Sequence, residues 1–186
     1  MSGRILLGID PGFAAFGWAL LVLGDGATDD HVVAAGVIHT EKSAKKREVR
    51  GSDDNVRRTR VIADKLFELL TAHEPVAVAA ESFSPPRNAS TAAKVALAWG
   101  AVVACARAHL DPPLLQASPQ ELKIAVCGSK SASKEEIEAA LAARYPSANA
   151  AIGRIKQGDR EHVWDAIGAA HACLDTEVVR MARRMR

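Results

Sequence analysis

Two acidic residues stand where short apolar segments end. Asp10 closes the run at residues 4–10, and Glu81 directly follows the run at residues 76–80; both runs are typical of buried strands. Asp10 also fits the first position of a turn with Pro11, but Glu is uncommon in strands and costly to bury without a partner. Two carboxylates at the carboxyl ends of neighbouring strands would repel each other, so the pair predicts a hard divalent cation between them.

A histidine and a third carboxylate occur on a predicted helix late in the chain. His162 and Asp165 are three residues apart, so they share one face of the helix predicted over residues 161–174. Small residues that would let this helix lie close to a sheet follow at Ala166, Gly168, Ala169 and Ala170. The spacing alone is more typical of a surface pair than of metal ligands. With Asp10 and Glu81, however, it predicts a site for two divalent ions about 3.5–4 Å apart, which activate a water and stabilise the leaving oxygen of a phosphodiester.

Strands and helices alternate in an order that can position these residues. The first three predicted strands form an antiparallel meander, and helices and strands then alternate before the chain ends in helices. The predicted strands cover residues 4–10, 17–23, 32–40, 76–80 and 114–117, and the predicted helices cover residues 54–74, 89–109, 118–128, 133–145 and 161–174, with a polar loop after 146. We expect the Ala-rich helix at 89–109 to be mostly buried. This order predicts one α/β domain with a mixed five-stranded sheet over residues 1–175, followed by a basic tail at 176–186.

The overall composition excludes several classes of protein. The 186 residues are 48% apolar, 25% charged and 4% aromatic, which is typical of a globular chain and not of a disordered one. The longest uncharged apolar stretch, residues 95–106, falls short of the roughly 20 residues of a membrane span, and the start lacks a signal peptide, so we expect a cytoplasmic protein without membrane contact. Three scattered cysteines argue against a disulfide framework and a zinc site: Cys105, Cys127 and Cys173.

Positive charge is concentrated in two segments although the formal net charge is only +2. Residues 42–60 hold eight basic against three acidic side chains, and residues 180–186 hold four arginines. The rest of the chain is therefore acidic. Such asymmetry suits a polyanionic partner, although a solvated loop and a frayed terminus would have the same composition.

Four motifs occur along the chain in the order and spacing of one family. They are Leu7–Gly12 with Gly17 before an aromatic residue, residues 81–100 with Asn88, Lys94 and Gly100 in register, the pair Lys123 and Lys134 around Gly128, and His162–Ala166. Together they make the chain resemble the RuvC family of Holliday junction resolvases, which have the RNase H-like fold. The resemblance extends to about Leu174 and implies a mixed sheet with helices on both faces. A divergent or phage-type member fits as well as a cellular one.

The resemblance implies a divalent-metal-dependent endonuclease that cuts four-way DNA junctions by paired symmetric nicks. It implies Mg²⁺ as the cofactor, two ions per site with Mn²⁺ able to substitute, and a homodimer whose candidate interface is the helix at 89–109. The metal ligands and catalytic residues would be Asp10, Glu81, His162 and Asp165, with Lys123 as a further catalytic residue. The residues expected to bind DNA are Arg58, Phe83, Arg87, Asn88, Lys94, Lys130 and Lys134. A helicase partner for branch migration cannot be read from the sequence.

Three segments depart from the family pattern. The loop at residues 41–55 is longer and more basic than expected, and the turn at residues 13–16 lacks hydroxyl and basic side chains for phosphate contacts. Phe83 stands one residue early for the aromatic side chain that the family places after Glu81. A core position for Phe83 is therefore as consistent with the sequence as stacking on a base.

Other functions are compatible with parts of this pattern. A branched-DNA nuclease of broader specificity, which cuts flaps or forks, would carry the same motifs. A non-catalytic DNA-binding module is disfavoured because the three acidic residues and His162 occur together. A phosphotransferase of the actin and sugar-kinase type shares a glycine-rich turn like that at residues 8–12, but it needs two such domains and 186 residues are too few.

Overall fold

A five-stranded sheet forms the centre of the molecule in a computed structural model, which describes residues 4–25, 29–44, 49–82 and 88–184. The order across the sheet is β3-β2-β1-β4-β5. The first three strands are antiparallel, and β4 and β5 run parallel to β1, which confirms the predicted mixed sheet. The strands are β1 (Ile5–Asp10), β2 (Ala15–Val22), β3 (His31–His39), β4 (Ala77–Glu81) and β5 (Leu114–Ala117).

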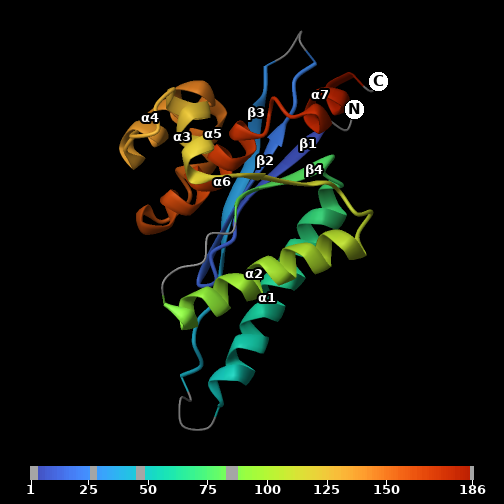
Figure 1. Cartoon of the computed structure of the whole chain (residues 1–186), viewed down its shortest axis with the longest axis vertical. Coiled ribbons are helices and arrows are strands. Elements are labelled where there is room, and N and C mark those ends of the chain that lie inside the picture. The colour runs from blue at the N-terminus through green and yellow to red at the C-terminus, as the bar shows by residue number, and fades with distance from the viewer. Residues whose placement is uncertain (1–3, 26–28, 45–48, 83–87, 185–186) are drawn as a thin grey trace.

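Helices cover both faces of this sheet (Figure 1). One face carries α1 (Gly51–His73) and α2 (Ala89–Ala108), and the other carries α3 (Pro119–Cys127), α4 (Lys134–Arg144), α5 (Pro146–Ile152) and α6 (Arg160–Ala172). Successive strand residues point to opposite faces, so the sheet separates two buried clusters. Leu7 and Ile9 of β1 pack with residues of α1 and α2, whereas Leu6 packs with residues of α6.

Two strand glycines allow α6 to lie directly on the sheet. A Cβ atom on Gly8 of β1 would overlap the carbonyl oxygen of Ala166, and one on Gly17 of β2 would overlap that of His162. The neighbouring helix α3 approaches α6 in the same way, since Leu122 would lie 3.1 Å from a Cβ on Gly168. This close approach sets the height of α6 above β1 and β2, and hence the position of the side chains near its start.

Local capping signals set the starts of α3 and α4 as predicted. Ser118 accepts a hydrogen bond from the backbone N–H of Glu121, whose carboxylate accepts one in return from the N–H of Ser118. Ser133 and Glu136 form the same reciprocal pair at the start of α4. Gly128, with φ of 72°, closes α3 in the left-handed conformation.

The carboxyl-terminal segment corrects one prediction. Residues expected to trail away as a basic tail form a helix, α7 (Glu177–Arg184), whose Val179 is fully buried. Arg183 of this helix forms an ion pair with Asp30 at 2.7 Å, so the tail prediction is wrong for this segment. Asp30 lies 153 residues before Arg183 in the sequence, so the local sequence pattern around α7 could not predict that this helix packs against the rest of the protein. The predicted polar loop after residue 146 likewise contains the short helix α5.

The helix α2 is less buried than predicted. One side of it packs along α1, but Leu97 and Val103 on the other side are exposed, Val103 by 51%. Within the described part of the chain, α2 is also the one helix long and apolar enough, by length and composition alone, to cross a membrane. The outward side of α2 is therefore apolar and open to solvent in the single chain.

Candidate active site

The strands β1 and β4 bring the first two carboxylates together. Ile9 pairs with Ala80 across these parallel strands, so Asp10 and Glu81 follow side by side where the strands end. Both carboxylates lie on the α6 face, because the sheet alternates and the preceding residues on the same face, Gly8 and Ala79, contact α6 or its cluster. The structure thus places these two residues at one edge of the sheet, as predicted from the strand runs.

The helix α6 adds the imidazole and the third carboxylate. Its first turn lies over β1 and β2, where the carbonyl of His162 contacts Gly17, the residue paired with Asp10. Nδ1 of His162 donates a hydrogen bond to Oδ2 of Asp10 at 2.7 Å. Asp165 follows one turn later on the same helix face. All four side chains that the sequence singled out therefore gather at one place.

Negative charge is in surplus at this place. Burial, together with the charges of Asp10 and Glu81, raises the pKa of Asp165 to about 7. Burial and the charge of Asp10 likewise raise the pKa of Glu81. The pKa of His162 is raised mainly by its hydrogen bond to Asp10, which favours the imidazolium form. A bound cation would relieve the repulsion between these carboxylates and favour their ionised forms.

The donor set is chemically suited to a divalent cation. Carboxylate oxygens are the ligands of hard cations such as Mg²⁺ and Mn²⁺, and an imidazole is an acceptable ligand for Mn²⁺. Among the described residues no three Asp, Glu, His or Cys side chains stand close enough together to hold an ion as they are oriented here. Asp10 is engaged by His162 instead. The surplus of charge and the shared edge of the sheet nonetheless fit a cation that would draw these oxygens together.

Comparison with known proteins assigns the chain to a family. The profile described as "Crossover junction endodeoxyribonuclease RuvC" matches residues 6–145. The chain belongs to the RuvC family. The RuvC protein of Salinibacter ruber is 33% identical over 144 residues, covering 75% of this chain and 74% of that protein, and the RuvC protein of Halorhodospira halophila is 31% identical over 166 residues, covering 89% and 86%. Membership in the RuvC family implies dependence on a divalent metal.

Solved structures of the RuvC family share the fold. A structure of Thermus thermophilus RuvC superposes with a TM-score of 0.72 at 25% identity, covering 97% of this chain and 98% of that one. The structure described as T. thermophilus RuvC in complex with Holliday junction substrate gives a TM-score of 0.69 at 22% identity, covering 91% and 92%. The five-stranded mixed sheet with helices on both faces is thus the architecture of the RuvC family.

Of the two lysines singled out from the RuvC resemblance, Lys134 lies nearer the carboxylates. It begins α4, forms an ion pair with Glu161, and its charge lowers the pKa of Glu81 and Asp165 against the opposing effect of burial. Lys123 is half-buried on α3, and its charge is not among those that shift the pKa of these two carboxylates within the described structure. The sequence predicts catalysis for Lys123 and DNA binding for Lys134, whereas it is the charge of Lys134 that acts on Glu81 and Asp165.

The other residues predicted to bind DNA lie at varied places. Asn88 caps α2 by accepting a hydrogen bond from the N–H of Thr91 at 3.1 Å, and Lys94 donates to Oγ of Ser90 one turn later. Lys130 is exposed in the turn between α3 and α4. Phe83 and Arg87 fall outside the described residues.

Arg58 is a correction. It is only 3% exposed, so the prediction that it binds DNA is wrong. It lies on the face of α1 that also buries Asp54 and Ile62, four residues to either side. The sequence contains this helical spacing, but the local excess of basic residues in the segment 42–60 led to the prediction of a DNA contact for Arg58.

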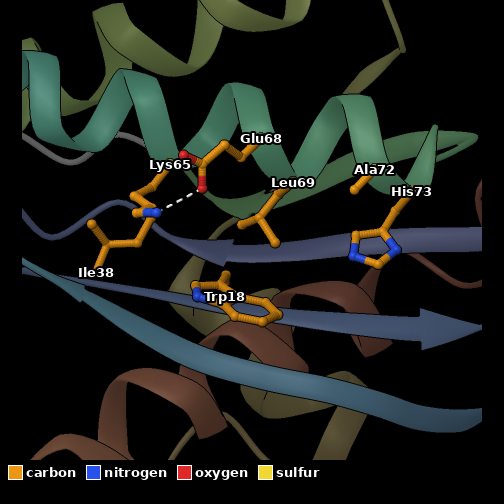
Figure 2. Close-up of a pocket in the computed structure, with 7 residues that line it drawn as sticks. All are labelled: Trp18, Ile38, Lys65, Glu68, Leu69, Ala72 and His73. Atoms are coloured by element: carbon orange, nitrogen blue, oxygen red, sulfur yellow. Dashed lines mark hydrogen bonds and ion pairs between the residues drawn. The ribbon is translucent and has the colours of Figure 1, made fainter.

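A pocket that sequence reasoning did not anticipate lies on the opposite face of the sheet. Figure 2 shows its floor, formed by the indole of Trp18, and its wall, formed by α1 with Leu69, Ala72 and His73. The pocket measures about 300 Å³, and its Lys65 and Glu68 pair with each other at 2.7 Å. Its mostly apolar lining lies on the α1 side of the sheet, whereas Asp10, Glu81 and Asp165 lie on the α6 side.

Proposed function

We propose that this protein is a metal-dependent endonuclease that resolves four-way DNA junctions by cutting two strands at symmetric positions. The observation that carries the proposal is the convergence of Asp10, Glu81, His162 and Asp165 at one edge of a RuvC-family sheet. The surplus negative charge at that edge supports a role for bound cations. The family description, crossover junction endodeoxyribonuclease, names the same substrate and reaction.

The three carboxylates and His162 would hold two Mg²⁺ ions, for which Mn²⁺ would substitute. Bound there, the ions supply an activated water and stabilise the leaving oxygen of the phosphodiester. Glu81 and Asp165 must be ionised to serve as ligands, and Lys134 helps by lowering the pKa of both. His162 keeps a proton on Nδ1 toward Asp10 and so orients that carboxylate.

Lys134 would stabilise the charge that develops on the scissile phosphate. Its ammonium is tethered by Glu161 and lies within electrostatic reach of Asp10 and Asp165. It also stands at the first turn of α4, where the helix dipole favours an anion. A positive charge held in advance at this point favours the transition state without reorganisation.

The exposed side of α2 would form the interface of a homodimer. Its outward residues are apolar or small and recur at helical spacing: Ala93, Ala96, Leu97, Gly100, Val103 and Ala104. Two symmetric nicks need two active sites, which a twofold dimer provides. Val103→Glu should therefore convert the dimer to a monomer in sedimentation velocity and replace paired cuts by single nicks. A dimer that survives Val103→Glu together with Leu97→Glu would contradict this assignment.

The decisive experiment compares labelled four-way junctions, forks, flaps and linear duplex side by side. We expect paired cuts in the four-way junction with Mg²⁺ or Mn²⁺, none with chelator, and little cutting of linear duplex. Equal cutting of forks and flaps would favour a branched-DNA nuclease of broader specificity. Tight junction binding without cutting under any metal would favour a non-catalytic DNA-binding module.

A further inference from the structure

A buried arginine holds the turn that follows Asp10. Nε of Arg58 donates to Oγ1 of Thr40 at 2.9 Å, and Nη2 donates to the carbonyl oxygen of Thr40 at 3.1 Å. The guanidinium carbon also lies 4.4 Å from the centre of the Phe13 ring, a cation–π contact. Arg58 thus joins α1 to the end of β3 and to the turn between β1 and β2.

Thr40 in turn hydrogen-bonds to the turn between β1 and β2. Its hydroxyl donates to the carbonyl oxygen of Phe13 at 2.5 Å, and its N–H donates to that of Ala14 at 2.9 Å. Within the turn, the N–H of Gly12 donates to the carbonyl oxygen of Asp10 at 2.8 Å. A continuous path of hydrogen bonds and short chain segments therefore connects the arginine with the backbone of the proposed metal ligand.

Stability alone does not account for an arginine at this position. Burial lowers the pKa of Arg58 by more than the nearby charge of Asp54 raises it. Asp54 lies one turn earlier, but its carboxylate accepts from Arg57 at 2.8 Å and from the backbone N–H of Ser43. Among the described residues no carboxylate is bonded to Arg58, and a buried charge in that situation is usually less stable than an apolar side chain of similar size. The planar fork of donors on Arg58, by contrast, is suited to fix Thr40 from two directions.

We propose that Arg58 is a positioning residue that holds Asp10 in place through Thr40 and the turn at residues 11–14. The proposal rests on the junction cleavage proposed above and gives Arg58 no contact with DNA or metal. Asp10 is the last residue of β1, so the path of the chain just after it decides where its carboxylate lies. A loosened turn would misplace this ligand relative to Glu81 on the adjacent strand.

The first test compares two neighbouring arginines. At saturating junction and Mg²⁺, Arg58→Gln should cut about tenfold to a hundredfold more slowly, because a misplacement on the order of 1 Å costs up to about a hundredfold. Junction affinity and its salt dependence should not change, since Arg58 is buried. Arg57→Gln is the matched control: it removes the same charge one residue away, from a half-exposed side chain, and should leave the rate unchanged.

Two further variants separate position from charge. Thr40→Val removes the shared hydroxyl without changing any charge and should slow cleavage in the same direction as Arg58→Gln. Arg58→Lys keeps the charge but loses the forked geometry, and it should not restore the wild-type rate. If both single variants, Arg58→Lys and Thr40→Val, cut junctions at the wild-type rate, the proposal is overturned.

Binding of Mn²⁺ to the DNA-free protein, followed by electron paramagnetic resonance, provides a readout independent of cleavage. We expect weaker Mn²⁺ binding in Arg58→Gln and Thr40→Val than in Arg57→Gln. Variants that only lose stability would show a smaller active fraction in single-turnover assays with a normal rate, and this outcome would overturn the proposal. So would a folded Arg58→Gln with wild-type rate and Mn²⁺ affinity. A wild-type protein that fails to cut junctions would instead overturn the proposed function.

Discussion

Carboxylates at the two ends of the sheet have their pKa values shifted in opposite directions. Where β1 and β4 end, Asp10, Glu81 and Asp165 crowd together, and burial with the neighbouring charges raises the pKa of Asp165 to about 7. At the other end, Asp30 accepts hydrogen bonds from two nitrogens of Arg183, each at 2.7 Å. Burial there would raise the pKa of Asp30, but the hydrogen bonds from Arg183 and from the backbone outweigh it and lower the pKa.

The contrast indicates which end serves the fold and which serves chemistry. A carboxylate that stabilises the fold has its partner within the chain, as Asp30 has in Arg183 of α7. A group of carboxylates that serves a reaction keeps a surplus of charge for a ligand to neutralise. Variants at the two ends should therefore separate activity from stability.

The largest effect is expected at the end of the sheet where negative charge is in surplus. Asp10→Asn should abolish cleavage, because it removes a proposed metal ligand, while junction binding stays the same or tightens as negative charge near the phosphates is lost. Glu81→Gln and Asp165→Asn should behave alike. Thermal unfolding should show no loss of stability in Glu81→Gln and Asp165→Asn, since each reduces repulsion between like charges, and a small loss in Asp10→Asn, which also weakens the ion pair with His162. A cleavage rate near that of the wild type in any of the three would exclude that residue from the metal site.

A smaller loss of activity should distinguish the two lysines. Lys134→Ala should slow cleavage of bound junction about a hundredfold, the typical cost of losing one charge positioned for the transition state. Lys123→Ala, which makes the same charge change on a different helix, should cut at close to the wild-type rate once the junction is saturating. Single-turnover rates measure both. The reverse order would restore the sequence-based assignment of catalysis to Lys123.

Breaking the Asp30–Arg183 ion pair should lower the stability of the fold. Asp30→Asn should lower the free energy of unfolding by about 2 kcal/mol, because it weakens a charge-assisted hydrogen-bonded pair that is largely buried. The rate of cleavage of bound junction should not change. Urea unfolding measures the loss, and Asp29→Asn, at the exposed neighbouring position, is the control. A cleavage defect in Asp30→Asn without a stability loss would show that the two ends are not separable.

The pH dependence of this stability has a definite sign. The pKa of Asp30 is lowered in the folded protein from an ordinary value of 3.8, so its contribution is fully present above that pH. As the pH falls through the lowered value, Asp30 takes up a proton in the folded state and the contribution disappears. The unfolding free energies of the wild type and Asp30→Asn should therefore converge in acid. A gap that stays constant with pH would assign the effect to packing.

The smallest effect is expected from the exposed arginines of α7. Arg180→Gln with Arg184→Gln should leave the salt dependence of junction binding unchanged, because α7 lies at the end of the sheet remote from the carboxylates (Figure 1). If either arginine neutralised a phosphate, its removal would flatten the slope of log affinity against log salt by about 0.9. A flatter slope would extend the DNA-binding surface to both ends of the sheet.

Features set by neighbours in sequence were predictable. The apolar runs before Asp10 and Glu81 indicated the two strands, and the Ser-x-x-Glu pattern at Ser118 and Ser133 indicated two helix starts. Each depends on side-chain alternation or on hydrogen bonds within one turn, which act in the same way wherever the segment lies. The family motifs extended this interpretation to the fold and to the four site residues.

Which side chains of a segment are buried, paired or exposed could be known only from the tertiary structure. The sequence identified two basic segments, but only the fold showed that Arg58 is buried under the turn after Asp10 and that Arg183 pairs with Asp30. It also showed that one side of α2 remains exposed and that Lys134 is nearer the carboxylates than Lys123. The physical reason is that burial and charge pairing depend on contacts between residues far apart in the chain, whose geometry exists only once the layers have packed.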